Sequence, residues 1–124
     1  MDILKSIIML DQDTVEITYE DNIKVDLDGL KNAWVKLDAY TEKRRLKKLI
    51  IVGKRTEITH EARKYGHEEA KIRSKFIVAE AIVVHNLPQK MVANFYSNFI
   101  KELYPIKYFT EIEDAKAWLS LLQN

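Results

Sequence analysis

The chain has 124 residues, of which 47% are hydrophobic and 31% are charged, and its formal net charge is +1. This size and balance are typical of one globular domain with a single core, so we predict one domain over residues 1–124. There is no Cys, which excludes disulfides, thiol catalysis and Cys-ligated metals and suits a cytoplasmic location.

The N-terminus is a poor signal peptide. Asp2 lies where a signal peptide needs positive charge, and Lys5 interrupts the first apolar run. No apolar run approaches the length that spans a membrane. We therefore expect a cytoplasmic protein without a membrane span.

Charge is unevenly distributed along the chain. Residues 1–30 carry eight acidic and two basic side chains, a net charge of −6, whereas residues 43–75 carry twelve basic and four acidic ones, a net charge of +8. Two solvated surfaces of opposite sign are the favoured interpretation, because long charged runs are usually surface. A basic patch that meets an anionic partner is the alternative, and nucleic-acid binding is a weak option.

The chain begins with two predicted strands. Residues 3–10 and 14–19 are rich in β-branched side chains, and the acidic loop 11–13 between them predicts a hairpin. Apolar and polar residues alternate in 14–19, so one face of that strand contacts solvent. Residues 23–25 extend the strand or belong to a loop.

A helix is predicted next, running to about Glu42. Asp26 or Asp28 caps its N-terminus, because a short carboxylate accepts hydrogen bonds from the free N–H groups there. The apolar residues recur at helical spacing. Its apolar face consists of Leu27, Leu30, Trp34 and Leu37.

The run Leu49–Gly53 organises the rest of the chain. It is short, apolar and β-branched, which predicts a strand buried on both faces of a parallel or mixed sheet. The basic residues of segment 43–48 lead into this strand and favour the C-terminus of the preceding helix through its dipole. Ligands bind beyond the carboxyl ends of the strands in open α/β sheets, so the loop after Gly53 is the first candidate site.

A second helix and a second buried strand follow. Thr59 is a predicted N-cap, and Gly66 weakens the helix by roughly 1 kcal/mol relative to Ala. Residues 79–84 form the strand. The helix face expected to pack consists of Ile58, Ala62, Tyr65, Glu69, Ile72 and Phe76.

The last part of the chain predicts two helices and an edge strand. Pro88 suits the first turn of a helix, residues 106–109 form the strand, and Thr110–Glu113 form a capping box for the final helix. The apolar face of the first of these helices consists of Met91, Val92, Phe95, Phe99 and Leu103. The inner face of the second consists of Ile112, Ala115, Trp118, Leu119 and Leu122.

The resulting order is ββαβαβαβα. Alternation of strands and helices favours an α/β protein with a mixed, mostly parallel β-sheet and helices packed on it.

Several short segments resemble a known family. They are Thr59–Tyr65, Ala81–Val84, Asn94-Phe95, Pro105-Ile106, Phe109-Thr110 and Ala115–Leu119. Together they are similar to a group of small, mostly uncharacterised bacterial proteins with the anti-sigma factor antagonist fold, which is also called STAS-like. The resemblance covers roughly residues 50–120 and implies a STAS-like fold.

The resemblance also implies a regulatory role. In better-known STAS domains a Ser or Thr at the start of the helix after a central strand is phosphorylated, and this controls binding to a partner kinase. By position, Thr56 or Thr59 is the counterpart in this chain. The Asp before and the Gly after the modified residue in that motif are replaced around Thr56 by Arg55 and Glu57.

The strand ends supply the candidate site for a ligand or partner. Lys54 and Arg55, with the N–H groups of the following helix, could hold an anion, and His85 would lie near Gly53 if the two buried strands are neighbours. A solvated basic loop and a plain N-cap at Thr59 are the alternatives. The candidate residues are Gly53, Lys54, Arg55, Thr56, Thr59, His85 and Asn86.

Two other groups of residues could form a site. His60 and His67 could share a helix face, but no third ligand follows at metal spacing, so we predict no metal site. Four aromatic residues could line an apolar pocket, although helical spacing favours core packing, and Tyr96 lies off the main apolar stripe where it could be exposed. They are Phe95, Tyr96, Phe99 and Tyr104.

We therefore expect a cytoplasmic, non-catalytic regulatory or protein-interaction module that binds an unidentified protein, such as a regulatory kinase-like partner. The alternative is a protein that binds a small anionic or amphipathic ligand, lipid-like or nucleotide-like, through loop 53–59 and His85. An enzyme is the least favoured class, because nucleophile, base and orienting group cannot be assembled. No cofactor is predicted, and a homodimer is left open.

Overall fold

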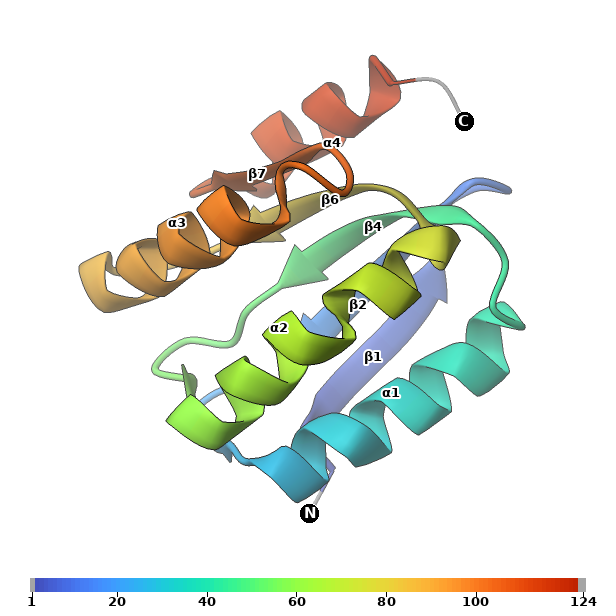
Figure 1. Ribbon diagram of the computed structural model, residues 1–124. Helices are drawn as coiled ribbons and strands as arrows, with labels where there is room; N and C mark the ends of the chain where they lie inside the picture. Colours follow the sequence, from blue (N-terminus) through green and yellow to red (C-terminus); the bar gives the residue numbers. More distant parts are fainter. Residues whose placement is uncertain (1, 123–124) are drawn as a thin grey trace.

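The computed structural model describes residues 2–122 and contains one main sheet covered by helices (Figure 1). Its strand order is β1-β2-β4-β6-β7; β1 pairs with β2 antiparallel, and the other neighbours are parallel. The mixed, mostly parallel sheet predicted from the sequence is confirmed. The strands are β1 (Leu4–Met9), β2 (Thr14–Tyr19), β4 (Leu46–Ile51), β6 (Ile77–Val83) and β7 (Ile106–Phe109).

Two very short strands lie outside the main sheet. β3 (Lys24–Val25) and β5 (Glu57–Ile58) pair in parallel with each other. This pairing brings the segment before the first helix next to the loop that follows β4. The uncertain segment 23–25 is therefore a strand of its own rather than an extension of β2.

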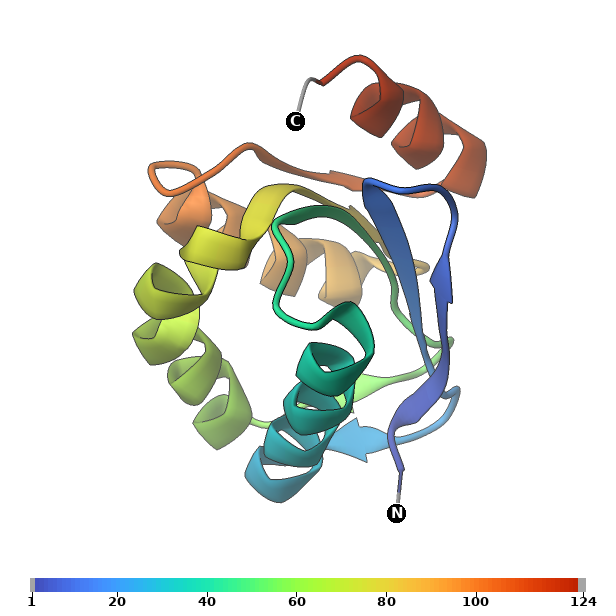
Figure 2. The ribbon, with the colours of Figure 1, turned by 90° about the vertical axis from the view of Figure 1, so that its right-hand side faces the viewer.

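The helices lie in two layers. Helices α1 (Leu27–Thr41), α2 (His60–Arg73) and α3 (Leu87–Ile100) cover one face of the sheet, and α4 (Ile112–Ser120) covers the other (Figure 2). A 3-10 turn, Ser74–Phe76, joins α2 to β6.

Alternation along β6 divides its side chains between the two layers. Ala81 and Val83 pack with Ala115 and Leu119 of α4, whereas the residues between them face the three-helix side, since neighbouring strand residues point to opposite faces. The predicted inner face of α4 is thereby confirmed, except that Ile112 is partly exposed.

Three helices have a side-chain N-cap, and two of these caps, Asp26 and Thr59, were predicted. A side-chain oxygen of Asp26, Thr59 or Asn86 accepts a hydrogen bond from the backbone N–H three residues later, at 2.8, 3.1 and 2.9 Å. The capping box at Thr110 is wrong, because α4 has Glu111 as its N-cap with no side-chain cap hydrogen bond. The helix begins one residue later than the box requires.

β4 begins at Leu46, three residues before the predicted start, so Lys47 and Lys48 are strand residues and not part of the approach to it. Pairing on both sides accounts for the difference, since Lys48 is the register partner of Val15 on β2 and of Glu80 on β6. Pairing with a strand on each side outweighs the low strand propensity of lysine.

The predicted face of α3 is wrong, whereas that of α2 is confirmed at Ile58, Ala62 and Tyr65 and is wrong at Ile72. Ile72 is 59% exposed, and Met91, Phe95 and Phe99 are all more than half exposed. The residues that α2 buries are Ala62, Gly66 and Ala70, and those that α3 buries are Gln89, Ala93 and Ile100.

Gln89 gives the physical reason for the rotation of α3. Its amide nitrogen donates to the carbonyl oxygens of Gly53 and Thr56, at 2.9 and 3.0 Å, and its side-chain oxygen accepts from the His85 N–H at 2.8 Å. A buried amide loses much free energy if these hydrogen bonds are not made. This side chain therefore turns the aromatic stripe of α3 outward.

Candidate functional site

A cavity of about 820 Å³ lies between the sheet and helices α1, α2 and α3. Small-molecule sites in proteins usually have volumes of about 300–1,000 Å³, so this space has the size of a ligand site. The side chains on its sheet side are Ile17, Tyr19, Lys48, Ile50, Val52, Glu80, Ile82 and Val84.

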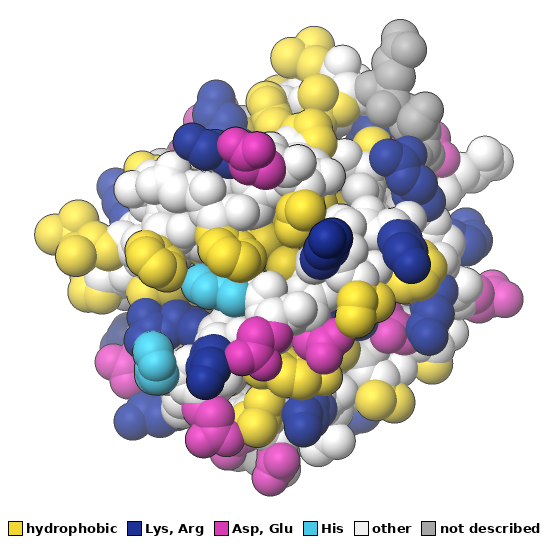
Figure 3. All heavy atoms as spheres, viewed as in Figure 1, with side chains coloured by type: hydrophobic (Ala, Val, Ile, Leu, Met, Phe, Trp, Pro, Cys, Tyr) yellow, Lys and Arg dark blue, Asp and Glu magenta, His cyan; other side chains and the backbone are white. Residues whose placement is uncertain are grey.

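Small residues on the covering helices leave this space open. Ala62, Gly66 and Ala70 of α2 and Ala93 of α3 line the cavity. A Cβ added at Gly66 would meet nothing within 4 Å. Met91 and Phe99 of α3 lie on the outer surface instead. Figure 3 shows hydrophobic side chains gathered over α3 and beside α2.

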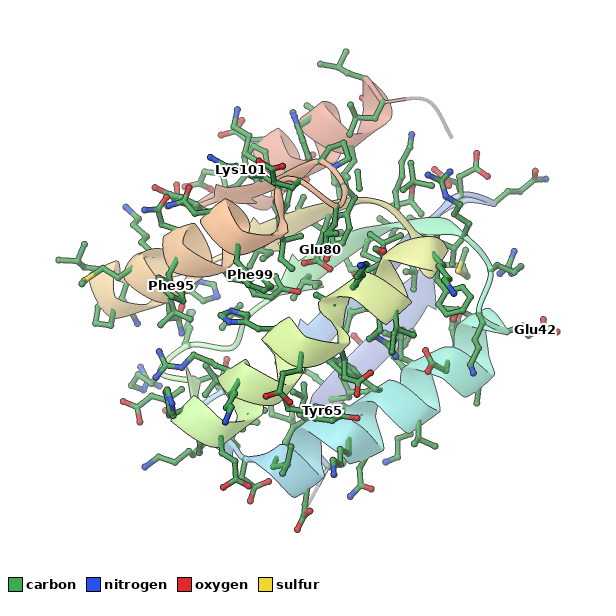
Figure 4. All side chains as sticks on the ribbon, in the orientation of Figure 1. Glu42, Tyr65, Glu80, Phe95, Phe99 and Lys101 are labelled. Carbon is green, nitrogen blue, oxygen red and sulfur yellow. The ribbon has the colours of Figure 1, made fainter. Side chains whose placement is uncertain are left out.

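Two charged side chains lie on the sheet side of the cavity. Lys48 and Glu80 are register partners on β4 and β6 and are 6% and 4% exposed. Figure 4 shows Glu80 pointing from β6 into the space between the sheet and helices α2 and α3. Burial raises the pKa of Glu80 to about 7, although Lys48 and Arg73 oppose the rise. Burial likewise lowers the pKa of Lys48 to about 8, against the effect of Glu80.

Three tyrosines, Tyr19, Tyr96 and Tyr104, also line the cavity. Burial raises the pKa of each hydroxyl, and the nearby Glu80 carboxylate raises it further. For Tyr19 the pKa rises to about 12. The three hydroxyls are therefore neutral at pH 7, and each can donate and accept a hydrogen bond.

Arg73 has a structural role at the same end of the cavity. Its guanidinium donates to both carboxylate oxygens of Asp38, at 2.8 and 3.1 Å, and lies 4.4 Å from the centre of the Trp34 ring. The bidentate pair with Asp38 and the contact with the Trp34 ring hold the guanidinium in place. Arg73 thus joins α2 to α1.

The seam between α2 and α3 is aromatic. The His67 ring stacks on Phe99 with 4.5 Å between ring centres and lies 5.6 Å from the Tyr96 ring. Burial and the neighbouring Arg63 lower the pKa of His67, so this ring is neutral at pH 7. Phe95 and Tyr96 line the cavity, and the predicted exposure of Tyr96 is wrong.

The residues predicted to form a site at the strand ends do lie together. A ring nitrogen of His85 is 2.6 Å from the Val52 carbonyl oxygen, and Gln89 bridges Gly53 and Thr56 as described above. Arg55, Thr56, Thr59 and Asn86 line one end of the cavity. Lys54 and His85 are exposed to solvent and Gly53 is buried, and none of the three lines the cavity.

The two candidate phosphorylation sites are already engaged. Thr56 is 7% exposed, and its hydroxyl donates to the Glu20 carbonyl oxygen at 2.5 Å. The Thr59 hydroxyl caps α2. Phosphorylation of either residue stays a prediction, and at Thr56 a kinase would need a conformation in which the hydroxyl is released.

Lys48 and Glu80 were not among the candidate residues predicted from the sequence. The sequence contained one signal for them, because each is a charged residue within or next to a run that reads as a buried strand. Charged side chains are seldom fully buried unless paired, and perturbed pKa values concentrate at functional sites. Within residues 2–122 no group of three or more His, Asp or Glu is placed to hold a metal.

Comparisons with known proteins give a family and a fold. A family model described as "Domain of unknown function (DUF7793)" matches residues 8–123. The structure is similar to the crystal structure of an uncharacterised protein of the DUF3478 family, with a SpoIIAA-like fold, from Shewanella loihica PV-4. The TM-score is 0.66 at 16% identity, over 92% of this chain and 90% of the other. No curated protein matches.

The similarity confirms the STAS-like, SpoIIAA-like fold expected from the sequence. At this identity it shows the fold alone, and function depends on the site that the fold carries. In the described part of the chain, no helix is long and apolar enough to cross a membrane.

Proposed function

The chain belongs to the DUF7793 family, a domain family of unknown function, and we propose that it binds a small molecule whose apolar body occupies the cavity beneath α2 and α3. This is the amphipathic-ligand alternative considered from the sequence, with the site moved from the loop after β4 to the interior. The observation that carries the proposal is the 820 Å³ cavity itself.

The size of the cavity favours an occupant in solution. The space is partly open to solvent, and its volume of about 820 Å³ lies within the range of about 300–1,000 Å³ that small-molecule sites usually have.

Water fills such a space well only where it finds polar partners. The cavity offers these partners around Glu80 and at the end lined by Arg55, Thr56, Thr59 and Asn86, whereas much of its remaining wall consists of Ile, Val and Ala side chains. An apolar molecule fits that part of the wall better than water does.

A fluorescence titration with N-phenyl-1-naphthylamine tests the proposal. This apolar dye brightens when it leaves water. We compare the wild type with Gly66→Leu, whose added side chain would occupy the cavity, and with Ala39→Leu, which adds a similar group at an exposed position of α1. Met91→Ser removes one member of the exposed α3 stripe and reports dye bound there.

We expect saturable binding of one dye per chain in the wild type, Ala39→Leu and Met91→Ser. Gly66→Leu should weaken binding by about tenfold or more, because the leucine and the dye compete for the same volume. Absence of saturable binding in the wild type, or equal binding in Gly66→Leu, would contradict the proposal.

A second candidate function is the protein-interaction module expected from the sequence. The supporting observation is a stripe of exposed apolar side chains spaced four residues apart along and just beyond α3: Leu87, Met91, Phe95, Phe99 and Leu103. Apolar patches of this kind often mark protein contacts. The test is a pull-down of a specific partner. The wild type should recover it, and the double variant Met91→Ser/Phe99→Ser should not. The control is Val35→Ser, which changes an exposed apolar residue of α1.

A further inference from the structure

Two buried residues of opposite charge line the cavity and act on each other through space. Lys48 and Glu80 are register partners on adjacent parallel strands, and both line the cavity. Among residues 2–122, no ion pair within 4.0 Å joins them, and no hydrogen bond to either charged group is present. Arg73 differs from both, because Asp38 holds its guanidinium.

Buried charged groups strongly favour a hydrogen-bonding partner. The tyrosine hydroxyls around Glu80 make the surroundings polar without adding charge. A ligand that enters the cavity therefore meets an ammonium donor and a carboxylate acceptor on neighbouring strands. The polar end of the ligand has to match this pair.

We propose that the polar end of the ligand is an uncharged group that both accepts and donates hydrogen bonds, a primary amide or a hydroxyl, held between Lys48 and Glu80. Its oxygen accepts from the Lys48 ammonium, and its N–H or O–H donates to the Glu80 carboxylate. This inference rests on the proposed function, and it names the chemical class of ligand that the same cavity selects.

The opposite signs of the two charges argue against an ionic head group. A carboxylate would be attracted by Lys48 and repelled by Glu80. An ammonium group would be attracted by Glu80 and repelled by Lys48. Either ion would also lose its hydration on entering the cavity. An amide or hydroxyl loses less hydration and gains two charge-assisted hydrogen bonds.

The pKa values of the pair fit this assignment. Near pH 7.4 both groups are partly charged, since the pKa of Glu80 is about 7 and that of Lys48 about 8. A proton that passes from Lys48 to Glu80 leaves the net charge of the pair unchanged. A neutral head group can hydrogen-bond to either form of the pair.

The test is displacement of N-phenyl-1-naphthylamine by four ligands that share a ten-carbon tail: decanamide, 1-decanol, decanoate and decylammonium. Titrations are made below the micelle concentrations at about pH 7.4, where the pair is expected to be charged in part. In the wild type we expect decanamide and 1-decanol to bind about tenfold tighter than either ion.

Two single substitutions each remove one of the two charged groups and leave the other in the cavity. In Glu80→Gln the remaining Lys48 ammonium should make decanoate the tightest of the four ligands. In Lys48→Met the remaining Glu80 carboxyl should instead shift the preference toward decylammonium. Thermal unfolding of each variant confirms that it is folded, and dye binding confirms that its cavity is intact.

The outcomes separate this inference from the proposed function. If neither the dye nor any tail binds the wild type, the proposed function fails. If all four ligands bind equally, or if an ion binds tightest, the cavity accepts apolar bodies but the head-group assignment is overturned. Unchanged selectivity in both single variants would overturn it as well.

Discussion

Glu80 gives the clearest pH signature at the scale of single residues. Its pKa rises from an ordinary value of 4.5 to about 7 because the carboxyl is buried. The folded chain then binds more protons than the unfolded chain between these two pH values. The free energy of unfolding should therefore fall as pH rises through this window.

We expect Glu80→Gln to remove this dependence. At pH 8 the variant should be more stable than the wild type by up to about 3 kcal/mol, because no charge is buried at position 80. Near pH 4 the two should be similar. Urea unfolding measured from pH 4 to 8 checks this, and a wild-type stability that rises between pH 5 and 7 relative to the variant would contradict the burial of this group.

Gly53 is a second residue whose role can be tested alone. A Cβ added there would overlap the Glu20 carbonyl oxygen and lie 2.6 Å from the Thr56 hydroxyl oxygen. Gly53→Ala should therefore destabilise the fold by about 1–3 kcal/mol, since backbone must move to admit the methyl group. A midpoint of chemical unfolding equal to that of the wild type would show that loop 53–56 is not held against β2.

Gly66 provides the contrasting case at the scale of one helix. It lies within α2, and an added Cβ would meet open space. Gly66→Ala should raise the free energy of unfolding by up to about 1 kcal/mol through the greater helix propensity of Ala. Chemical denaturation measures this, and a loss of stability would mean that the space beside Gly66 is filled by protein.

Two substitutions on α3 test whether its apolar stripe faces outward. Ile100 is fully buried, so Ile100→Ala should lower the free energy of unfolding by about 2–5 kcal/mol. Met91 is 65% exposed, so Met91→Ala should change it by less than about 0.5 kcal/mol. A larger loss of stability for Met91→Ala than for Ile100→Ala would mean that α3 packs with the face predicted from periodicity.

The sequence predicted the elements better than their orientations. Apolar β-branched runs located β4 and β6, and cap residues such as Asp26 located helix starts, because both signals are local. The rotation of α3 depends on hydrogen bonds from Gln89 to Gly53 and Thr56, which are more than thirty positions away in the chain. Periodicity cannot contain that information, so it assigned the wrong face to α3.

The candidate site shows the same division between local and distant information. Proximity of the loop after β4 to His85 followed from two neighbouring parallel strands and was predicted correctly. The cavity was not predicted. It arises where small residues of α2 and α3 face the sheet, and the strand pairing decides which side chains of the sheet face them. Lys48 and Glu80 become a pair only through the β4–β6 register.

At the scale of the whole molecule, the two faces of the sheet are packed differently. Helix α4 and the face of the sheet that it covers form a continuous apolar core. The opposite face meets three helices whose small inward residues leave ligand-sized space. The STAS-like fold thus has a packed apolar core on one face of the sheet and a ligand-sized cavity on the other.

The most direct test of that cavity is solution NMR of the complex with N-phenyl-1-naphthylamine, using chains labelled at Ile, Val and Ala methyl groups. We predict intermolecular nuclear Overhauser effects between the dye and Ile50, Ile82 and Ala93, which line the cavity. Val83 of β6 and Ala115 of α4, which pack together on the opposite face of the sheet, should show none. Effects confined to methyl groups outside the cavity, with none to Ile50 or Ile82, would contradict the central claim.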